Sequence, residues 1–277
     1  MSFWGHIDAL RGHLFRSALV VLILAVVAFF YPEFLFDKVI FGPLRSDFIT
    51  YRAFRHLGIF LHNHWPDWLS KILSAPEANA LDFGHYTFKL QSLGLSDQFT
   101  SQMWIAIVAG LIVGAPYVLW EIWRFIKPAL KDKEKKASTA FIVSATFLFL
   151  SGVLFSYYVI VPLMVNFLGN YQISTMIENN FTFDSYISTV TTLTLSAGLI
   201  FELPILVYFL TKFGIMTPQF MRKYRRHAIV VILIVAGVIT PSPDITSQLL
   251  VAFPLYFLYE ASIFVSYYVI KRKAKTE

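Results

Sequence analysis

The chain has 277 residues, of which 57% are hydrophobic, 17% aromatic and only 14% charged. Soluble domains are nearer to about 45–50% apolar and 25% charged, so this composition excludes an ordinary cytosolic enzyme, a disordered chain and a nucleic-acid-binding domain. The absence of cysteine excludes disulfides, thiolate metal sites and cysteine nucleophiles. What remains is a helical membrane protein, whose net charge of +6 raises the question of which membrane side the charges occupy.

Six segments are candidates to cross the membrane, since a span needs about 20 mostly apolar residues. These are 17–36, 103–123, 139–164, 187–210, the short 228–239, and 249–270. The runs are too long for strands and lack the alternation of a membrane β-barrel. We therefore expect one all-α integral membrane domain over residues 1–277 with six transmembrane helices.

The basic residues predict the orientation of these spans. Seventeen of the 23 lysines and arginines lie before the first span, after the last, or in the loops that follow spans two and four. The other six all lie in the first loop on the opposite side. The positive-inside rule then places both termini in the cytoplasm, although topology and contact with anionic lipid explain most of these charges taken singly.

The outer loop between spans one and two, residues 45–100, is unusually long. Asp47–Leu61 and Trp65–Leu73 have the pattern of short amphipathic helices that lie over a membrane surface. We interpret this loop as a cap or an additional docking surface.

The fifth span is short. Thr217 and Pro218 predict a helix start, because threonine caps helices and proline fits their first position. Its continuous apolar run, Ala228–Ile239, covers roughly 18 Å of a hydrocarbon core about 30 Å thick. Either the bilayer thins beside this helix, or neighbouring helices shield it from lipid.

Three acidic residues lie within or at the ends of spans, where charge is expensive to bury. Glu202 precedes Pro204 by two residues, and a proline there bends the helix. Glu202 either lines a polar cavity or subunit contact, or is a neutral carboxyl bonded to a neighbouring helix. Glu260 has the same two interpretations with less weight on function, and Glu121 is expected to be an ordinary interface residue that reaches water.

Evidence for catalysis is lacking in the sequence. The seven histidines are scattered without metal-ligand spacing, and no serine pairing has a protease-like context. Gly110 and Gly114 form a GxxxG pattern, which predicts close helix packing. We therefore expect a protein without enzymatic activity, metal or cofactor.

Short motifs occur in a recognisable order along the chain. They are His6-Ile-Asp-Ala-Leu-Arg11, Gly42-Pro-Leu44, Ala115-Pro-Tyr-Val-Leu-Trp-Glu-Ile-Trp123, Arg124-Phe-Ile-Lys-Pro-Ala-Leu130 with Glu134, Phe201-Glu-Leu-Pro204, and Thr240-Pro-Ser-Pro-Asp244 with Ser247 and Gln248. In this order on six spans, they resemble the TatC family, the multispanning core of the twin-arginine protein translocase. The resemblance covers nearly the whole chain apart from the enlarged outer loop.

The resemblance implies a receptor that binds twin-arginine signal peptides of folded proteins at the cytoplasmic face of the bacterial inner membrane. The family reads the arginine pair with a loop glutamate, which matches Glu134, and with Phe125 and Pro128 beside it. A planar guanidinium pairs well with a carboxylate, although Glu134 lies among lysines and could simply pair with them.

The N-terminal family motif contributes to the same predicted site. It contains a glutamate where this chain has Ala9, so Asp8, Leu10 and Arg11 are the candidate residues here. Asp8 is one position earlier, a rotation of about 100° on a helix.

The resemblance further implies recruitment of single-span TatA/TatB-type partners, export driven by the proton motive force, and a homo-oligomer within a larger complex. The family's intramembrane glutamate, which faces a concave interior of the bundle, matches Glu202. Partner-subunit contacts carry over to Thr240, Gln248 and Pro43, and the other expected contact is membrane lipid.

Two other classes remain possible from the residues alone. A secondary transporter or proton-conducting protein would use Glu202 and Glu260 as relay carboxylates, but no inverted repeat supports it. An insertase with a basic groove would need a basic residue inside a span, and the nearest, Arg16, lies at the edge.

Overall fold

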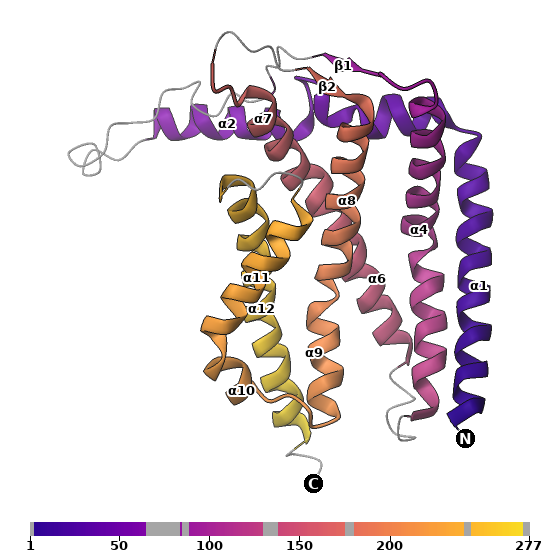
Figure 1. The fold of residues 1–277 in the computed structure, drawn as a ribbon. Helices are drawn as coiled ribbons and strands as arrows, with labels where there is room; N and C mark the ends of the chain where they lie inside the picture. Colours follow the sequence, from indigo (N-terminus) through magenta and orange to yellow (C-terminus); the bar gives the residue numbers. More distant parts are fainter. Residues whose placement is uncertain are drawn as a thin grey trace.

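The protein, examined as a computed structural model, is nearly all helical (Figure 1). The structure describes residues 3–64, 84, 89–129, 138–174, 180–240 and 245–273. Five helical segments in these ranges are long and apolar enough to cross a membrane: Ile7–Phe29, Asp97–Ile126, Ile142–Asn170, Phe183–Lys212 and Ser247–Arg272. The chain is thus an all-α membrane protein, and both termini lie at the same end of the bundle.

Helices α1 (Phe3–Phe29) and α4 (Asp97–Ile126) form one side of the molecule and run next to each other (Figure 1). The predicted glycine packing is confirmed, because a Cβ at Gly110 would come within 2.7 Å of the Ala25 nitrogen and the Val21 oxygen. The predicted first span, 17–36, is displaced. Its helix begins near the N-terminus and ends at Phe29, since Pro32 disfavours helical geometry in the residue before it.

Two interrupted helices form the middle of the bundle. The first runs as α6 (Ser138–Phe155), a π-helical turn η4 (Ser156–Ile160) and α7 (Val161–Asn170), with Pro162 just after the turn. The second runs as α8 (Phe183–Phe201) and α9 (Leu203–Lys212), and its break at Glu202 confirms the bend predicted before Pro204. Buried side chains of both, including Met164, Ile187 and Leu193, make up much of the main core.

A cap covers the end of the bundle opposite the termini (Figure 1). It contains η1 (Phe34–Ile40), η2 (Gly42–Leu44), α2 (Ile49–Asn63) and a two-residue parallel pairing of β1 (Leu90–Gln91) with β2 (Phe181–Thr182). The buried Tyr51 donates to the carbonyls of Pro43 and Pro162, which ties α2 to the bundle. Helix α2 confirms the first predicted amphipathic segment, and the second, Trp65–Leu73, lies outside the described residues.

The other side of the molecule is made by α10 (Pro218–Lys223), α11 (Arg225–Ile239) and α12 (Ile245–Lys273). The predicted helix start is confirmed, because Thr217 accepts a hydrogen bond from the Phe220 nitrogen at 3.2 Å. The expected single fifth helix is instead divided, since Tyr224 leaves helical geometry between α10 and α11. With 15 residues, α11 is about 22 Å long and stops short of the level that α4 and α8 reach (Figure 1).

Candidate functional site

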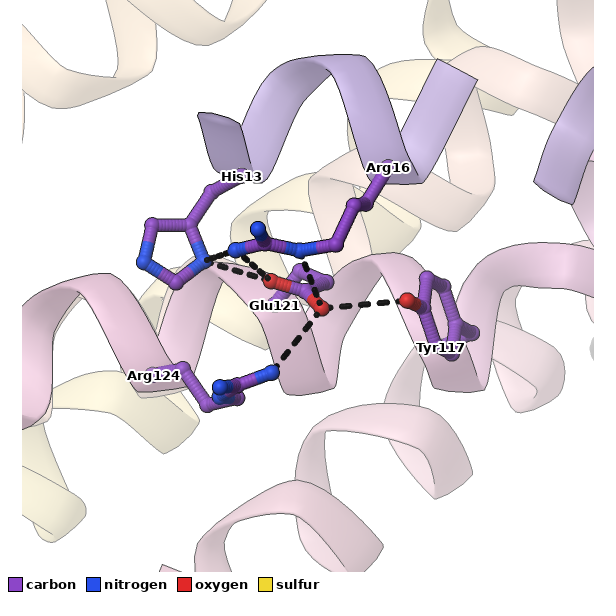
Figure 2. Close-up of polar contacts among 5 residues, drawn as sticks. All are labelled: His13, Arg16, Tyr117, Glu121 and Arg124. Carbon is purple, nitrogen blue, oxygen red and sulfur yellow. Dashed lines mark hydrogen bonds and ion pairs between the residues drawn. The ribbon is translucent and has the colours of Figure 1, made fainter. Parts of the chain in front are cut away.

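A buried carboxylate joins α1 to α4 at the end of the bundle that carries the termini. Glu121 of α4 contacts His13 and Arg16 of α1, together with Tyr117 and Arg124 of its own helix (Figure 2). We call these five residues the Glu121 cluster. The Glu121 side chain is only 1% exposed, whereas Arg16 and Arg124 are 44% and 46% exposed. The acid therefore lies beneath a half-exposed layer of basic groups.

Both oxygens of Glu121 are fully engaged. Oε1 accepts from Tyr117 Oη at 3.1 Å, Arg16 Nε at 3.2 Å and Arg124 Nη1 at 3.3 Å. Oε2 lies 3.2 Å from Arg16 Nη2 and 2.5 Å from His13 Nδ1. A carboxylate can only accept, so this contact requires a proton on Nδ1 of His13. The same nitrogen lies 3.0 Å from Arg16 Nη2. Burial of the charge is thereby compensated by charge-assisted hydrogen bonds.

The prediction that Glu121 is an ordinary, water-accessible interface residue is wrong. Residues 117, 121 and 124 share one face of α4, and 13 and 16 share one face of α1, so the two polar faces meet where the helices pack. Those spacings were present in the sequence. The missing information was that α1 packs against this face of α4.

The N-terminal candidates precede the cluster by about one helical turn. Asp8, Leu10 and Arg11 are exposed on α1, while Ala9 is half-buried. Ala9 and Arg16 lie on nearly the same face of α1, because seven residues correspond to nearly two full helical turns. Asp8 thus faces solvent and does not occupy the position that Ala9 takes beside α4.

The candidates from the end of α4 lie on the other side of the cluster. Phe125 is half-buried, and its ring contacts the His13 ring edge-on, with centroids 6.0 Å apart. Pro128 is exposed in the 3-10 turn η3 (Lys127–Ala129). The structure therefore brings Phe125 and the start of α1 together, and Glu134 lies outside the described residues.

Glu202, the predicted intramembrane acid, lies at the break between α8 and α9. Its Oε1 is buried and has no hydrogen-bond partner among the described residues. The backbone carbonyl of Glu202 accepts from the nitrogens of Ile205 and Leu206, so the break leaves the first turn of α9 ordered. This partly buried acid is not joined to the Glu121 cluster by any contact in the described ranges.

The three predicted partner contacts lie elsewhere in the fold. Thr240 ends α11 and is buried, and its hydroxyl has no partner among the described residues. Gln248 of α12 donates to the Leu233 carbonyl of α11 at 2.7 Å. Pro43 is buried within the cap, where its carbonyl accepts from Tyr51. Their roles in partner binding stay predictions.

Glu260 is paired rather than isolated. Its Oε2 accepts from Arg225 Nη2 at 2.7 Å, and its Oε1 accepts from Tyr256 at 3.2 Å. The pair joins α12 to the first turn of α11, and Glu260 is 23% exposed. An acid whose two oxygens are already held by an arginine and a tyrosine is poorly placed to relay protons.

Comparisons with known proteins agree with one another. The sequence model of the family described as Sec-independent protein translocase protein (TatC) matches residues 5–254. The TatC of Blattabacterium sp. subsp. Periplaneta americana is 39% identical over 274 residues, which cover 99% of this chain and 97% of that protein. The TatC of Halalkalibacterium halodurans is 37% identical over 68% of this chain and 74% of its own. A crystal structure of the twin-arginine translocase receptor TatC matches with a TM-score of 0.70 and 27% identity, over 96% of this chain and 99% of that chain.

Proposed function

Because the chain belongs to the TatC family of Sec-independent protein translocase proteins, we propose that it is the receptor subunit that binds twin-arginine signal peptides. The observation that carries this proposal is the meeting of the first turns of α1 with the end of α4. His13 and Arg16 of α1 contact Glu121 of α4 across 105 to 108 residues of sequence, and His13 also touches Phe125.

The proposed site has two parts. The exposed residues of α1 and η3 would contact the peptide around its arginine pair, and Glu134 would supply the carboxylate. Guanidinium groups pair bidentately with carboxylates, whereas lysine cannot do so, and this difference gives the receptor its selectivity. Because Glu121 already accepts five donors, Glu134 is the better candidate for contact with the peptide.

The remaining parts of the proposal concern assembly and the membrane. Both termini would face the cytoplasm of a bacterial cell, with α11 as a sixth, short span in the inner membrane. Thr240, Gln248 and Pro43 would contact TatA/TatB-type single-span partners in a homo-oligomeric complex. Glu202 would be the intramembrane polar residue that faces the concave interior, and export would use the proton motive force. The role is transport rather than catalysis.

Signal-peptide binding to the purified full-length protein tests this function. A labelled twin-arginine peptide and its twin-lysine version are titrated against wild type, Glu134→Gln and Asp132→Asn. We expect the arginine peptide to bind more tightly and the preference to disappear in Glu134→Gln alone. Asp132→Asn is the matched control, because it removes the same charge two residues away. Equal binding of both peptides to wild type would refute the receptor role.

A proton-conducting transporter is less well supported. That function requires intramembrane relay acids, and Glu260 is held by Arg225 and Tyr256. Arg16, the basic residue nearest to a span interior that an insertase would need, is engaged with Glu121. Proton flux through liposomes that contain this protein alone would instead favour the proton-conducting transporter over the receptor.

A further inference from the structure

The Glu121 carboxylate has no capacity left for a ligand. A carboxylate offers about four lone-pair sites, and five donors already converge on this one. The side chain is also almost fully covered by the groups that bind it. A peptide arginine could reach Glu121 only by displacing Arg16 or Arg124, so the geometry favours an indirect role.

Helix α1 packs along α4 and is otherwise largely exposed. Its span is only 6% buried, and long apolar side chains such as Phe15, Leu22 and Val26 are exposed along it. Burial of apolar surface does not drive helices together in lipid, where association depends on close packing and polar contacts. The close packing at Val21 and Ala25 lies well beyond the first turns of α1. The Glu121 cluster acts nearer to the start of the helix.

A buried ionic cluster is well suited to fixing one arrangement of two helices. Separation of α1 from α4 would leave the Glu121 charge without its donors in a poorly solvated place, which is costly. A screw motion of α1 by one residue would turn His13 and Arg16 by about 100° away from the acid. The cluster therefore selects a single register of α1 on α4.

The residues proposed to bind the peptide lie directly on both sides of this cluster. Leu10 and Arg11 precede His13 within one turn of α1, and Phe125 and Pro128 follow Arg124 within one turn of α4 and η3. Phe125 also touches His13 itself. Any change in the register of α1 would thus alter the spacing of the two halves of the site.

We propose that the Glu121 cluster is a positioning clamp that holds the first turns of α1 against the end of α4 and so sets the geometry of the signal-peptide site. Glu121, His13, Arg16 and Arg124 act through Leu10, Arg11, Phe125 and Pro128 and do not touch the peptide. The clamp's role in recognition rests on the proposed receptor function, whereas its effect on the position of α1 can be measured separately.

The test combines peptide binding with distances between spin labels in the full-length protein in lipid nanodiscs. The chain has no cysteine, so label pairs can be introduced directly. Leu14→Cys with Ile122→Cys reports on the clamped end, and Val26→Cys with Ile107→Cys reports on the opposite end of the same helix pair. All four side chains are exposed and lie outside the proposed peptide contacts.

We expect Glu121→Gln to broaden the distance distribution for labels at 14 and 122 while labels at 26 and 107 keep theirs. The preference for twin-arginine over twin-lysine peptide should fall severalfold, because the two halves of the site no longer keep a fixed spacing. Glu260→Gln is the matched control, because Glu260 also accepts from an arginine and from a tyrosine four residues earlier. It should leave both distances and the preference unchanged.

Several results would overturn the clamp. One is an unchanged peptide preference in Glu121→Gln. Another is a lost preference with unbroadened distances at 14 and 122, which would mean that Glu121 contacts the peptide. If the distance distributions of both label pairs broaden, the two helices have separated altogether. Glu121→Asp, which keeps the charge on a shorter side chain, is then the deciding variant. It must restore the distances and the peptide preference together, or the clamp is refuted. A wild type without any preference refutes the receptor function itself, and the clamp's role in recognition with it.

Discussion

Two carboxylates in this protein share a local pattern but have different surroundings. Tyr117 donates to Glu121 at 3.1 Å and Tyr256 donates to Glu260 at 3.2 Å, each from four residues earlier on the same helix. Each acid also binds an arginine from the helix packed beside it. Yet Glu121 is 1% exposed and Glu260 is 23% exposed. The same sequence pattern thus produces a buried cluster in one helix pair and a partly exposed ion pair in the other.

The difference follows from how closely the helices approach and how many donors surround the acid. Gly110 brings the backbones of α1 and α4 into contact, and the buried Glu121 then needs His13 and a second arginine to offset the loss of water. Glu260 is less covered and is held by one arginine and one tyrosine. The α1–α4 pair is therefore built for a fixed geometry, and the α11–α12 pair depends less on its ion pair.

The largest expected effect concerns the length of the α11–α12 side. Helix α11 has 15 residues, whereas the span within α1 has 23, so lipid beside α11 must be thin if lipid contacts it. Four leucines inserted after Ile234 would lengthen α11 by about 6 Å and relieve the mismatch. If thinning serves the passage of folded cargo, export of a folded twin-arginine cargo should be abolished in cells that carry this variant alone.

An insertion of four serines at the same point is the control. It lengthens and rotates the helix equally but adds no apolar length. Normal export by the leucine variant would exclude thinning as the reason for the short helix. Equal loss in both variants would instead assign the effect to the changed register of Thr240 and the residues before it.

A smaller effect is expected when the glycine at the close contact in each helix pair, Gly110 or Gly237, is replaced by alanine. A Cβ at Gly110 would meet backbone atoms of α1 at 2.7 Å, and backbone cannot move aside without moving the helix. A Cβ at Gly237 would lie 3.1 Å from the flexible end of Gln248, which can shift. We expect Gly110→Ala to lower the free energy of unfolding by about 1–3 kcal/mol, typical of overpacking, and Gly237→Ala to have little effect.

Unfolding in mixed detergent micelles, followed by circular dichroism, measures both glycine variants. Equal stabilities would show that α1 moves on α4 without cost, which contradicts a fixed geometry for that pair. A large loss of stability in Gly237→Ala alone would mean that the α11–α12 pair, rather than the α1–α4 pair, has the fixed geometry.

Much of the fold was predictable because its signals are local. Runs of apolar residues located the long spans, Gly110 and Gly114 predicted a close helix contact, and Thr217 predicted a helix start. Proline effects were only partly anticipated. The break before Pro204 was expected, but the end of α1 ahead of Pro32 was missed because the apolar run continues past it.

The site was harder to predict, since its partners are distant in sequence. Arg16 and Glu121 are separated by 105 residues, and composition gives no indication of which face of α4 meets α1. Phe125 and Pro128 were identified through the family resemblance rather than through their chemistry. The burial of Glu121 depends on helix packing, so a tyrosine four residues before the acid, which Glu260 also has, was not sufficient to distinguish the two.

The smallest expected effect tests how burial changes the contribution of a hydrogen bond whose geometry is nearly the same at both glutamates. Tyr117→Phe and Tyr256→Phe each remove one hydroxyl that donates to Oε1 of a glutamate four residues later, at nearly equal distances. Another polar group or water can replace the hydroxyl at the more exposed Glu260, whereas at the covered Glu121 nothing can enter to replace the lost hydrogen bond. Tyr117→Phe should therefore lower the Tm by less than Gly110→Ala, and Tyr256→Phe by less still. Equal decreases for the two tyrosines would mean that the hydrogen bond itself, rather than its burial, decides its contribution, and the distinction between the two carboxylates would then lie only in their numbers of basic partners.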